Sequence, residues 1–174
     1  MGMMHRLAIA AIAAATFLPA SAQASDQAFF ESVSGVWQGP GEIVAGKYKG
    51  TKFNCQLAGT PEPETGILMD GSCRVGVFTQ PMKARILKRG ETYSGSFLDG
   101  AAGKGLDIVS GIVDGERVVL GINRAQLDGA MVARLVDPQT MNVTISVKVG
   151  ESMVPVIGMT MTRNLDSLAV GSVR

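Results

Sequence analysis

Apolar and polar residues alternate along most of the chain, as they do in a β-strand that has one buried face. The clearest run extends from Met141 to Val149, where every second side chain is apolar. Phe53, Cys55 and Leu57 form a second run, separated by polar residues. Runs of this kind predict strands at residues 36–46, 50–58, 66–78, 81–88, 92–98, 105–113, 117–125, 130–136, 141–149 and 153–163.

Residues that favour tight turns separate these runs. Asp-Gly occurs at Asp99-Gly100, Asp114-Gly115 and Asp128-Gly129, which we interpret as hairpin turns. Alternation continues through Asp70-Gly71, so we interpret Gly71 as a bulge inside a strand. Short connections favour antiparallel neighbours in up-and-down order, and closure of such a sheet leaves no exposed edge. The pattern therefore predicts an all-β fold, an antiparallel up-and-down β-barrel of about eight to ten strands.

A different period precedes the first predicted strand. Phe29, Phe30 and Val33 share one face of a helix, and Ser25 or Asp26 can cap its beginning. We therefore expect a short N-terminal helical segment ahead of the barrel.

The first two dozen residues have the layout of a secretory signal peptide. Arg6 is followed by an apolar and small-residue run from Leu7 to Leu18, then by Pro19 and small residues. The run is too short to anchor the protein as a membrane-spanning helix. We expect residues 1–24 to be cleaved, which leaves residues 25–174 as a single barrel domain without a transmembrane segment. Its predicted location is the periplasm or the exterior of the cell.

The two cysteines, Cys55 and Cys73, both lie in the predicted mature domain. An even pair in an exported chain is typical of a disulfide, and here both residues occupy inward positions of neighbouring predicted strands. The alternative is a reactive thiol or a metal site. A metal site needs further ligands that the chain lacks, so no metal is expected.

The net charge and the histidine content restrict the range of possible functions. The chain has 16 Lys and Arg against 15 Asp and Glu, so no general attraction to nucleic acid or to an anionic membrane is expected. A basic cluster at Lys83, Arg85, Lys88 and Arg89 is interpreted as a solvated strand face and turn.

The single histidine, His5, lies in the predicted signal peptide, which removes imidazole chemistry from the mature domain. An enzyme is therefore the least favoured reading, and no cofactor is expected. A carboxylate pair remains open, with candidates at Glu42, Asp70, Asp99 and Asp107.

An outer-membrane barrel would also show alternating strands. That class predicts aromatic girdles and a polar lumen. Aromatic residues make up only 5% of this chain, and the alternate positions are apolar on one face only. The pattern favours a barrel with an apolar interior.

Three residues carry a family resemblance. Gly35 and Trp37 form a Gly-x-Trp start to the first predicted strand, and Arg163 ends the last one. This resembles the signature of the calycin superfamily, which includes lipocalins, fatty-acid-binding proteins, avidins and bacterial metalloprotease inhibitors. The resemblance implies that Trp37 packs against Arg163 where the barrel closes, with a short helix over one barrel end.

The inhibitor branch shares three features with this chain: export, the Gly-x-Trp start and one early disulfide. Those inhibitors insert an N-terminal tail into the protease, and residues 25–29 would be that tail here.

Methionines and small residues recur at alternate strand positions, and both are compatible with an adaptable apolar lumen. The alternative is a fully packed core that uses methionine as filler. The residues assigned to the lumen are Tyr93, Gly95, Phe97, Met82, Met131, Met141, Met159 and Met161.

The favoured function is that of an exported, non-enzymatic barrel that binds a small apolar ligand such as a lipid. The alternative is a protein-binding module of the same fold, a periplasmic protease inhibitor or a cell-envelope assembly factor. Such a module would use its rim loops, with residues 60–66 and 99–105 as the first candidates.

Overall fold

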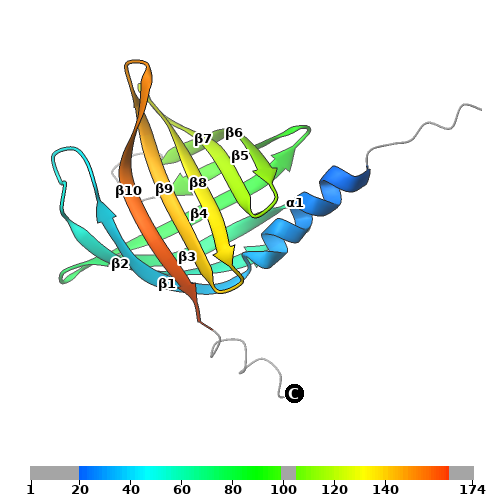
Figure 1. The fold of residues 1–174 in the computed structure, drawn as a ribbon, viewed down its shortest axis with the longest axis horizontal. Coiled ribbons are helices and arrows are strands. Elements are labelled where there is room, and N and C mark those ends of the chain that lie inside the picture. Colours follow the sequence, from blue (N-terminus) through cyan, green and yellow to red (C-terminus); the bar gives the residue numbers. More distant parts are fainter. Residues whose placement is uncertain (1–19, 99–104, 165–174) are drawn as a thin grey trace, which may run out of the picture.

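The alternating runs form a closed antiparallel barrel in the computed structural model, which describes residues 20–98 and 105–164 (Figure 1). One helix, α1 (Ala20–Ser32), precedes ten strands. These are β1 (Gly35–Ile43), β2 (Lys52–Pro61), β3 (Gly66–Val75), β4 (Phe78–Arg89), β5 (Thr92–Leu98), β6 (Leu106–Asp114), β7 (Arg117–Arg124), β8 (Leu127–Asp137), β9 (Thr140–Val149) and β10 (Ser152–Arg163).

Each strand pairs with the next along the chain, and β10 pairs with β1 to close the barrel. The predicted up-and-down order is therefore confirmed. Because successive strands are antiparallel, their connections alternate between two ends. The helix end carries α1 and residues 62–65, 90–91, 115–116 and 138–139, whereas the opposite end carries residues 44–51, 76–77, 125–126 and 150–151. The described residues include no helix that is long and apolar enough to cross a membrane.

Two local predictions are wrong in their details. No register shift occurs at Gly71, which pairs in sequence with Leu57 and Met82, so this residue is not a bulge. Because Gly71 has no side chain, β2 can approach β3 closely there. A Cβ at this position would lie 2.0 Å from the carbonyl oxygen of Gln56. Asp128-Gly129 lies within β8, and the turn before it is at Ala125, which has a φ of 54°. The turn at Asp99-Gly100 lies outside the described residues.

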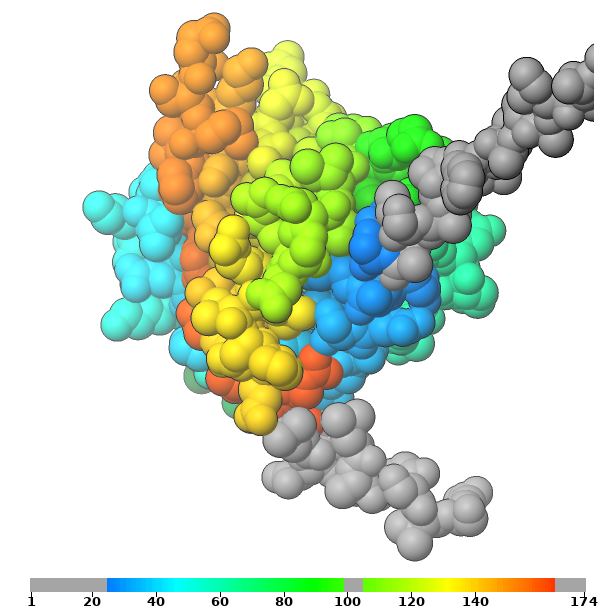
Figure 2. All heavy atoms as spheres, turned by 45° about the vertical axis from the view of Figure 1, so that its right-hand side comes forward, coloured from blue at the N-terminus to red at the C-terminus, as the bar shows by residue number. Residues whose placement is uncertain are grey.

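Helix α1 begins earlier than expected and covers one end of the barrel, as Figure 2 shows from the side of the helix. Asp26 therefore lies within the helix and does not cap it. Phe29, Phe30 and Val33 are all buried against the barrel interior. The expected apolar face of the segment thus closes the helix end of the barrel.

The barrel closes where Trp37 on β1 pairs with Arg163 on β10. The guanidinium of Arg163 lies 4.3 Å from the centroid of the Trp37 ring, a cation–π arrangement. Arg163 also donates hydrogen bonds to the carbonyl oxygens of Ser32 and Ser34, and burial lowers its pKa. The Trp37 indole is fully buried and donates from Nε1 to the carbonyl oxygen of Val33 at 2.9 Å. One pair of side chains therefore joins the first strand, the last strand and the end of the helix. Gly35, with a φ of 98°, makes the bend between helix and β1.

A second set of contacts holds α1 from its middle. Asp26 accepts hydrogen bonds from the Tyr93 hydroxyl on β5 at 2.6 Å and from Lys88 Nζ on β4 at 2.7 Å. Asp26 and Tyr93 are both buried. Burial, together with the hydrogen bond to Asp26, raises the pKa of Tyr93 above its ordinary value. Sequence patterns did not indicate this network, because Asp26 lies 62 residues from Lys88 and 67 residues from Tyr93 in the chain.

We predict that Trp37 and Arg163 are energetically coupled. In a double-mutant cycle with Trp37→Phe and Arg163→Met, the free energies of unfolding should deviate from additivity by about 0.5 to 2 kcal/mol. Urea denaturation of the four proteins measures this deviation. Additive losses would show that ring and guanidinium contribute independently.

We also predict that Tyr93 makes the fold sensitive to alkaline pH. The pKa of Tyr93 is higher in the folded than in the unfolded protein. Its contribution to the free energy of unfolding is therefore fully present below about pH 10 and decreases as the pH rises further. Unfolding free energies at about pH 8 and about pH 11 should therefore fall less in Tyr93→Phe than in the wild type. The exposed Tyr48 gives the matched control: Tyr48→Phe should behave like the wild type. Equal slopes for both variants would contradict the prediction.

Candidate functional site

The barrel encloses a cavity of about 430 Å³. Its wall receives side chains from α1 and from all ten strands except β1, and most of these side chains are apolar. The cavity ends at α1 on one side. On the other side it reaches Val75 and Leu127, which are 40% and 42% exposed. The cavity therefore meets solvent at the end opposite α1, which we call the open end.

Six residues assigned to the lumen line this cavity: Phe97, Met82, Met131, Met141, Met159 and Met161. The methionines come from four strands, β4, β8, β9 and β10. Their flexible thioether side chains surround open space, so the lumen is not packed solid.

Two residues assigned to the lumen do not line the cavity. Tyr93 points inward but lies beneath α1, with its ring 5.5 Å from that of Phe30 and its hydroxyl on Asp26. Gly95 has a φ of 157°, and a Cβ there would lie 1.8 Å from the carbonyl oxygen of Arg85. The backbone approaches β4 too closely at Gly95 for any side chain to enter the lumen.

The wall also contains residues that the sequence analysis did not assign to the lumen. They include Phe53, Leu57, Ile67, Met69, Ala84, Ile86, Ala133 and Ile145. Period-two alternation places all of them on the inner face, so the signal was present. Alternation cannot tell which inward side chains fill the lumen and which border empty space.

Cys55 and Cys73 form a disulfide in the cavity wall. The two residues are directly opposite each other in the register of β2 and β3. The bond therefore links the neighbouring strands β2 and β3 covalently on the inner face of the barrel.

Polar side chains are scarce along this wall. Among the described residues that line the cavity, only Gln80 and Arg124 carry amide or charged groups. Both lie near the open end, Gln80 early in β4 and Arg124 at the end of β7. Arg124 donates from Nε to the carbonyl oxygen of Gly105 at 3.0 Å. The cavity is thus apolar in its depth and polar only near its mouth.

The basic cluster considered from the sequence is paired with acids. Lys83 contacts Asp70 at 3.2 Å, Lys88 contacts Asp26 at 2.7 Å, and Arg89 contacts Glu64. Arg85 donates to Glu62 at 2.8 Å, and this hydrogen bond lowers the pKa of the Glu62 carboxyl. These ion pairs neutralise the positive charges that would otherwise attract an anionic ligand.

The remaining candidates lie away from the cavity. Glu42, Asp70 and Asp107 do not line it, and Asp99 is outside the described residues. The segment considered as an inhibitory tail lies within α1, where Phe29 is buried. Of the two rim loops considered, residues 62–65 lie at the helix end, and residues 99–104 are not described.

The outer face of the described strands is mainly polar. Gln38, Gln56, Lys83, Asn142 and Thr160 are exposed there, opposite the apolar wall of the cavity. A barrel that faces lipid along its strands needs the reverse distribution.

Comparison with known proteins adds evidence on the fold. No protein-family model matches the chain, and no curated protein matches it by sequence. Among solved structures it is similar to Rv2717c from M. tuberculosis, with a TM-score of 0.55 and 13% identity over 80% of this chain and 97% of that one. It is also similar to a DUF3598-family protein of unknown function from Nostoc punctiforme, with a TM-score of 0.50 and 12% identity over 78% of this chain and 49% of that one. At these identities the likeness shows a shared barrel fold.

Proposed function

We propose that the protein is a non-enzymatic barrel that binds a small apolar molecule, such as a lipid, in its lumen. The observation that carries this proposal is the apolar cavity of about 430 Å³, closed by α1 and open at the other end. Its volume lies in the range of small-molecule binding sites, which are concave, mainly apolar and supplied with few polar groups.

The distribution of polar groups suggests how such a ligand lies. The deep wall offers only apolar contacts, from residues such as Phe30, Ile67 and Met161. Gln80 and Arg124 lie near the mouth. A molecule with an apolar chain and a polar head matches this order, with the chain toward α1 and the head toward the open end. A fatty acid is the simplest ligand of that kind.

The closure contact supports kinship with the calycins. Gly35, Trp37 and Arg163 occupy the strands that the resemblance requires, and a helix closes the adjacent barrel end. Binding of apolar molecules in the lumen would then follow the general use of that fold. This kinship rests on geometry, since no sequence match supports it.

Export is the second part of the proposal. The disulfide between Cys55 and Cys73 is of the kind that persists in oxidising compartments such as the periplasm. Residues 1–19 of the predicted signal lie outside the described residues, and α1 begins at Ala20. Cleavage after residue 24 would shorten α1 but retain Asp26, Phe29 and Phe30, which hold it to the barrel.

The test is titration with fatty acids of increasing chain length, from octanoate to stearate, followed by calorimetry and thermal unfolding. A ligand that binds only the folded protein, at about 100 times its Kd, should stabilise it by about 2.7 kcal/mol and raise Tm by about 5 to 10 °C. Trp37 emission is a poor reporter, because Trp37 is buried at the helix end and does not line the cavity.

Enlarging a wall residue should block the site. Ala84→Leu places extra volume in the cavity and should weaken binding about tenfold or more, and Ala133→Leu on β8 should do the same. Ala58→Leu is the matched control, because Ala58 is exposed on the outer face of β2. Saturable binding that is unaffected by both wall variants, or no thermal shift with any chain length, would refute the proposal.

A further inference from the structure

The open end carries apolar side chains that project into solvent. Val77 and Phe78, at the turn between β3 and β4, are 90% and 77% exposed. Tyr48 in the β1–β2 connection is also exposed, as are Val149 and Met153 on either side of the β9–β10 turn. We call these five residues the apolar rim. They come from three separate connections around one cavity mouth, so they form a broken ring and not a single patch.

Basic side chains accompany the apolar rim. Lys47, Lys49, Lys52, Arg74 and Lys148 are exposed on the same connections or on the adjoining strand ends. No ion pair involves any of these five among the described residues, and Lys47 lies 5.5 Å from the centroid of the Tyr48 ring. Among the described residues at this end the acidic ones are fewer: Glu42, Asp107, Asp128 and Glu151.

The helix end has the opposite charge. Its connections and strand ends carry Glu31, Glu62, Glu64, Glu91, Glu116 and Asp137, besides Asp26 and Asp114. Among the described residues at this end the bases are fewer, and ion pairs such as Arg89 with Glu64 and Arg117 with Asp114 neutralise one acid for each base. The chain is therefore balanced in total but polarised along the barrel axis. Net charge alone predicts no general attraction to anionic membranes, whereas this polarity gives the open end a local positive charge.

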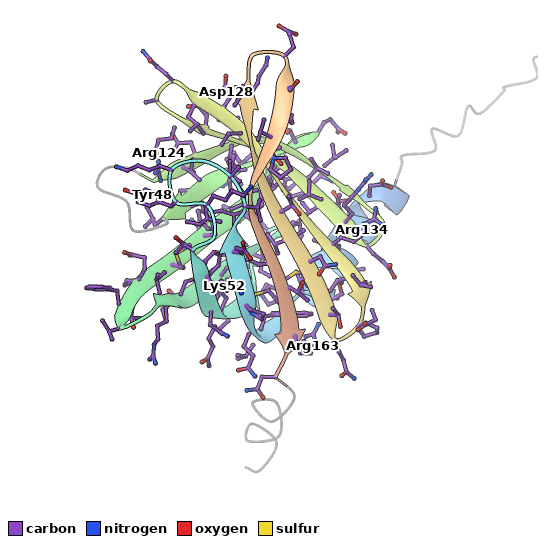
Figure 3. The ribbon with its side chains drawn as sticks, turned by 60° about the vertical axis from the view of Figure 1, so that its left-hand side comes forward. Tyr48, Lys52, Arg124, Asp128, Arg134 and Arg163 are labelled. Carbon is purple, nitrogen blue, oxygen red and sulfur yellow. A yellow bond between two sulfur atoms is a disulfide. The ribbon has the colours of Figure 1, made fainter. Side chains whose placement is uncertain are left out.

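We propose that the open end docks on the surface of an anionic lipid bilayer. Apolar side chains at the tips of loops enter the boundary between headgroups and acyl chains, while neighbouring lysines and arginines contact anionic headgroups. A bilayer offers both partners at once across a broad plane, so it contacts every tip of the broken ring. Figure 3 shows Tyr48 and Arg124 together at this end, away from Arg163 at the helix end.

Docking in this orientation joins the cavity mouth to the membrane. An apolar ligand would then pass between bilayer and cavity without crossing bulk water. This transfer step rests on the proposed function, whereas the docking itself rests only on the rim.

The test is sedimentation with vesicles of phosphatidylcholine alone or of phosphatidylcholine mixed with phosphatidylglycerol. The full-length mature protein should sediment with the anionic vesicles, and added salt should release it. A basic residue near an anionic surface changes partitioning by about fivefold, so Lys47→Glu combined with Lys49→Glu should weaken binding by about tenfold or more. Val77→Ser combined with Phe78→Ser should also weaken it, through loss of apolar insertion.

Matched controls exist on β8 toward the helix end. Arg134→Glu makes the same kind of charge reversal at an exposed residue, and Val136→Ser removes an apolar side chain that is also exposed. Both should bind vesicles like the wild type. Circular dichroism and thermal unfolding verify that each variant is folded.

The outcomes separate the two proposals. Vesicle binding that is absent in the wild type, or equally sensitive to rim and control variants, overturns docking even if fatty acids still bind in solution. Vesicle binding that depends on the rim, in a protein that takes up no fatty acid, supports docking and refutes the proposed function. A rim that binds an acidic protein but no vesicle also overturns docking.

Discussion

The structure depends on the closure of one sheet upon itself. A ten-stranded meander has two edges with unpaired backbone groups, and pairing β1 with β10 removes both. Trp37 and Arg163 lie at that seam, and Arg163 also bonds the backbone at the end of α1. Closure of the barrel and its capping by α1 therefore depend on the same contact. The interaction that joins the last strand to the first also directs the helix over the barrel end. The enclosed cavity exists because both happen together.

Much of this fold follows from the period of the sequence. Alternation in runs such as Met141–Val149 determines which side chains face inward, because successive residues of a strand point to opposite faces. The same rule placed Met82, Met131 and Met159 correctly on the cavity wall. It failed at Gly95, where the path of the backbone, and not its period, decides whether a side chain fits. Local turn propensity likewise misplaced the turn at Asp128-Gly129, because both residues pair with β7, and Gly129 also pairs with β9, so that β8 extends through them.

The interactions that the sequence could not show are those between distant residues of unlike type. Asp26, Lys88 and Tyr93 meet only because α1 lies across the ends of β4 and β5. Nothing in the neighbourhood of Asp26 marks it as buried, and its position suggested a cap. The same holds for the separation of charge between the two barrel ends. The antiparallel order of the strands creates this separation of charge, because successive connections along the chain lie at alternate ends of the barrel.

The disulfide has a consequence for the path by which a molecule reaches the lumen. A small molecule can enter a barrel laterally if two neighbouring strands separate and their hydrogen bonds break and re-form. Cys55 and Cys73 tie β2 to β3 covalently at directly opposed positions, and this seam cannot part while the bond is intact. The Trp37–Arg163 contact strengthens the seam between β1 and β10 near the helix end. With these two seams fastened and α1 across one end, a lateral opening of the barrel would have to occur at one of the other eight strand pairs, whereas the mouth already opens along the barrel axis.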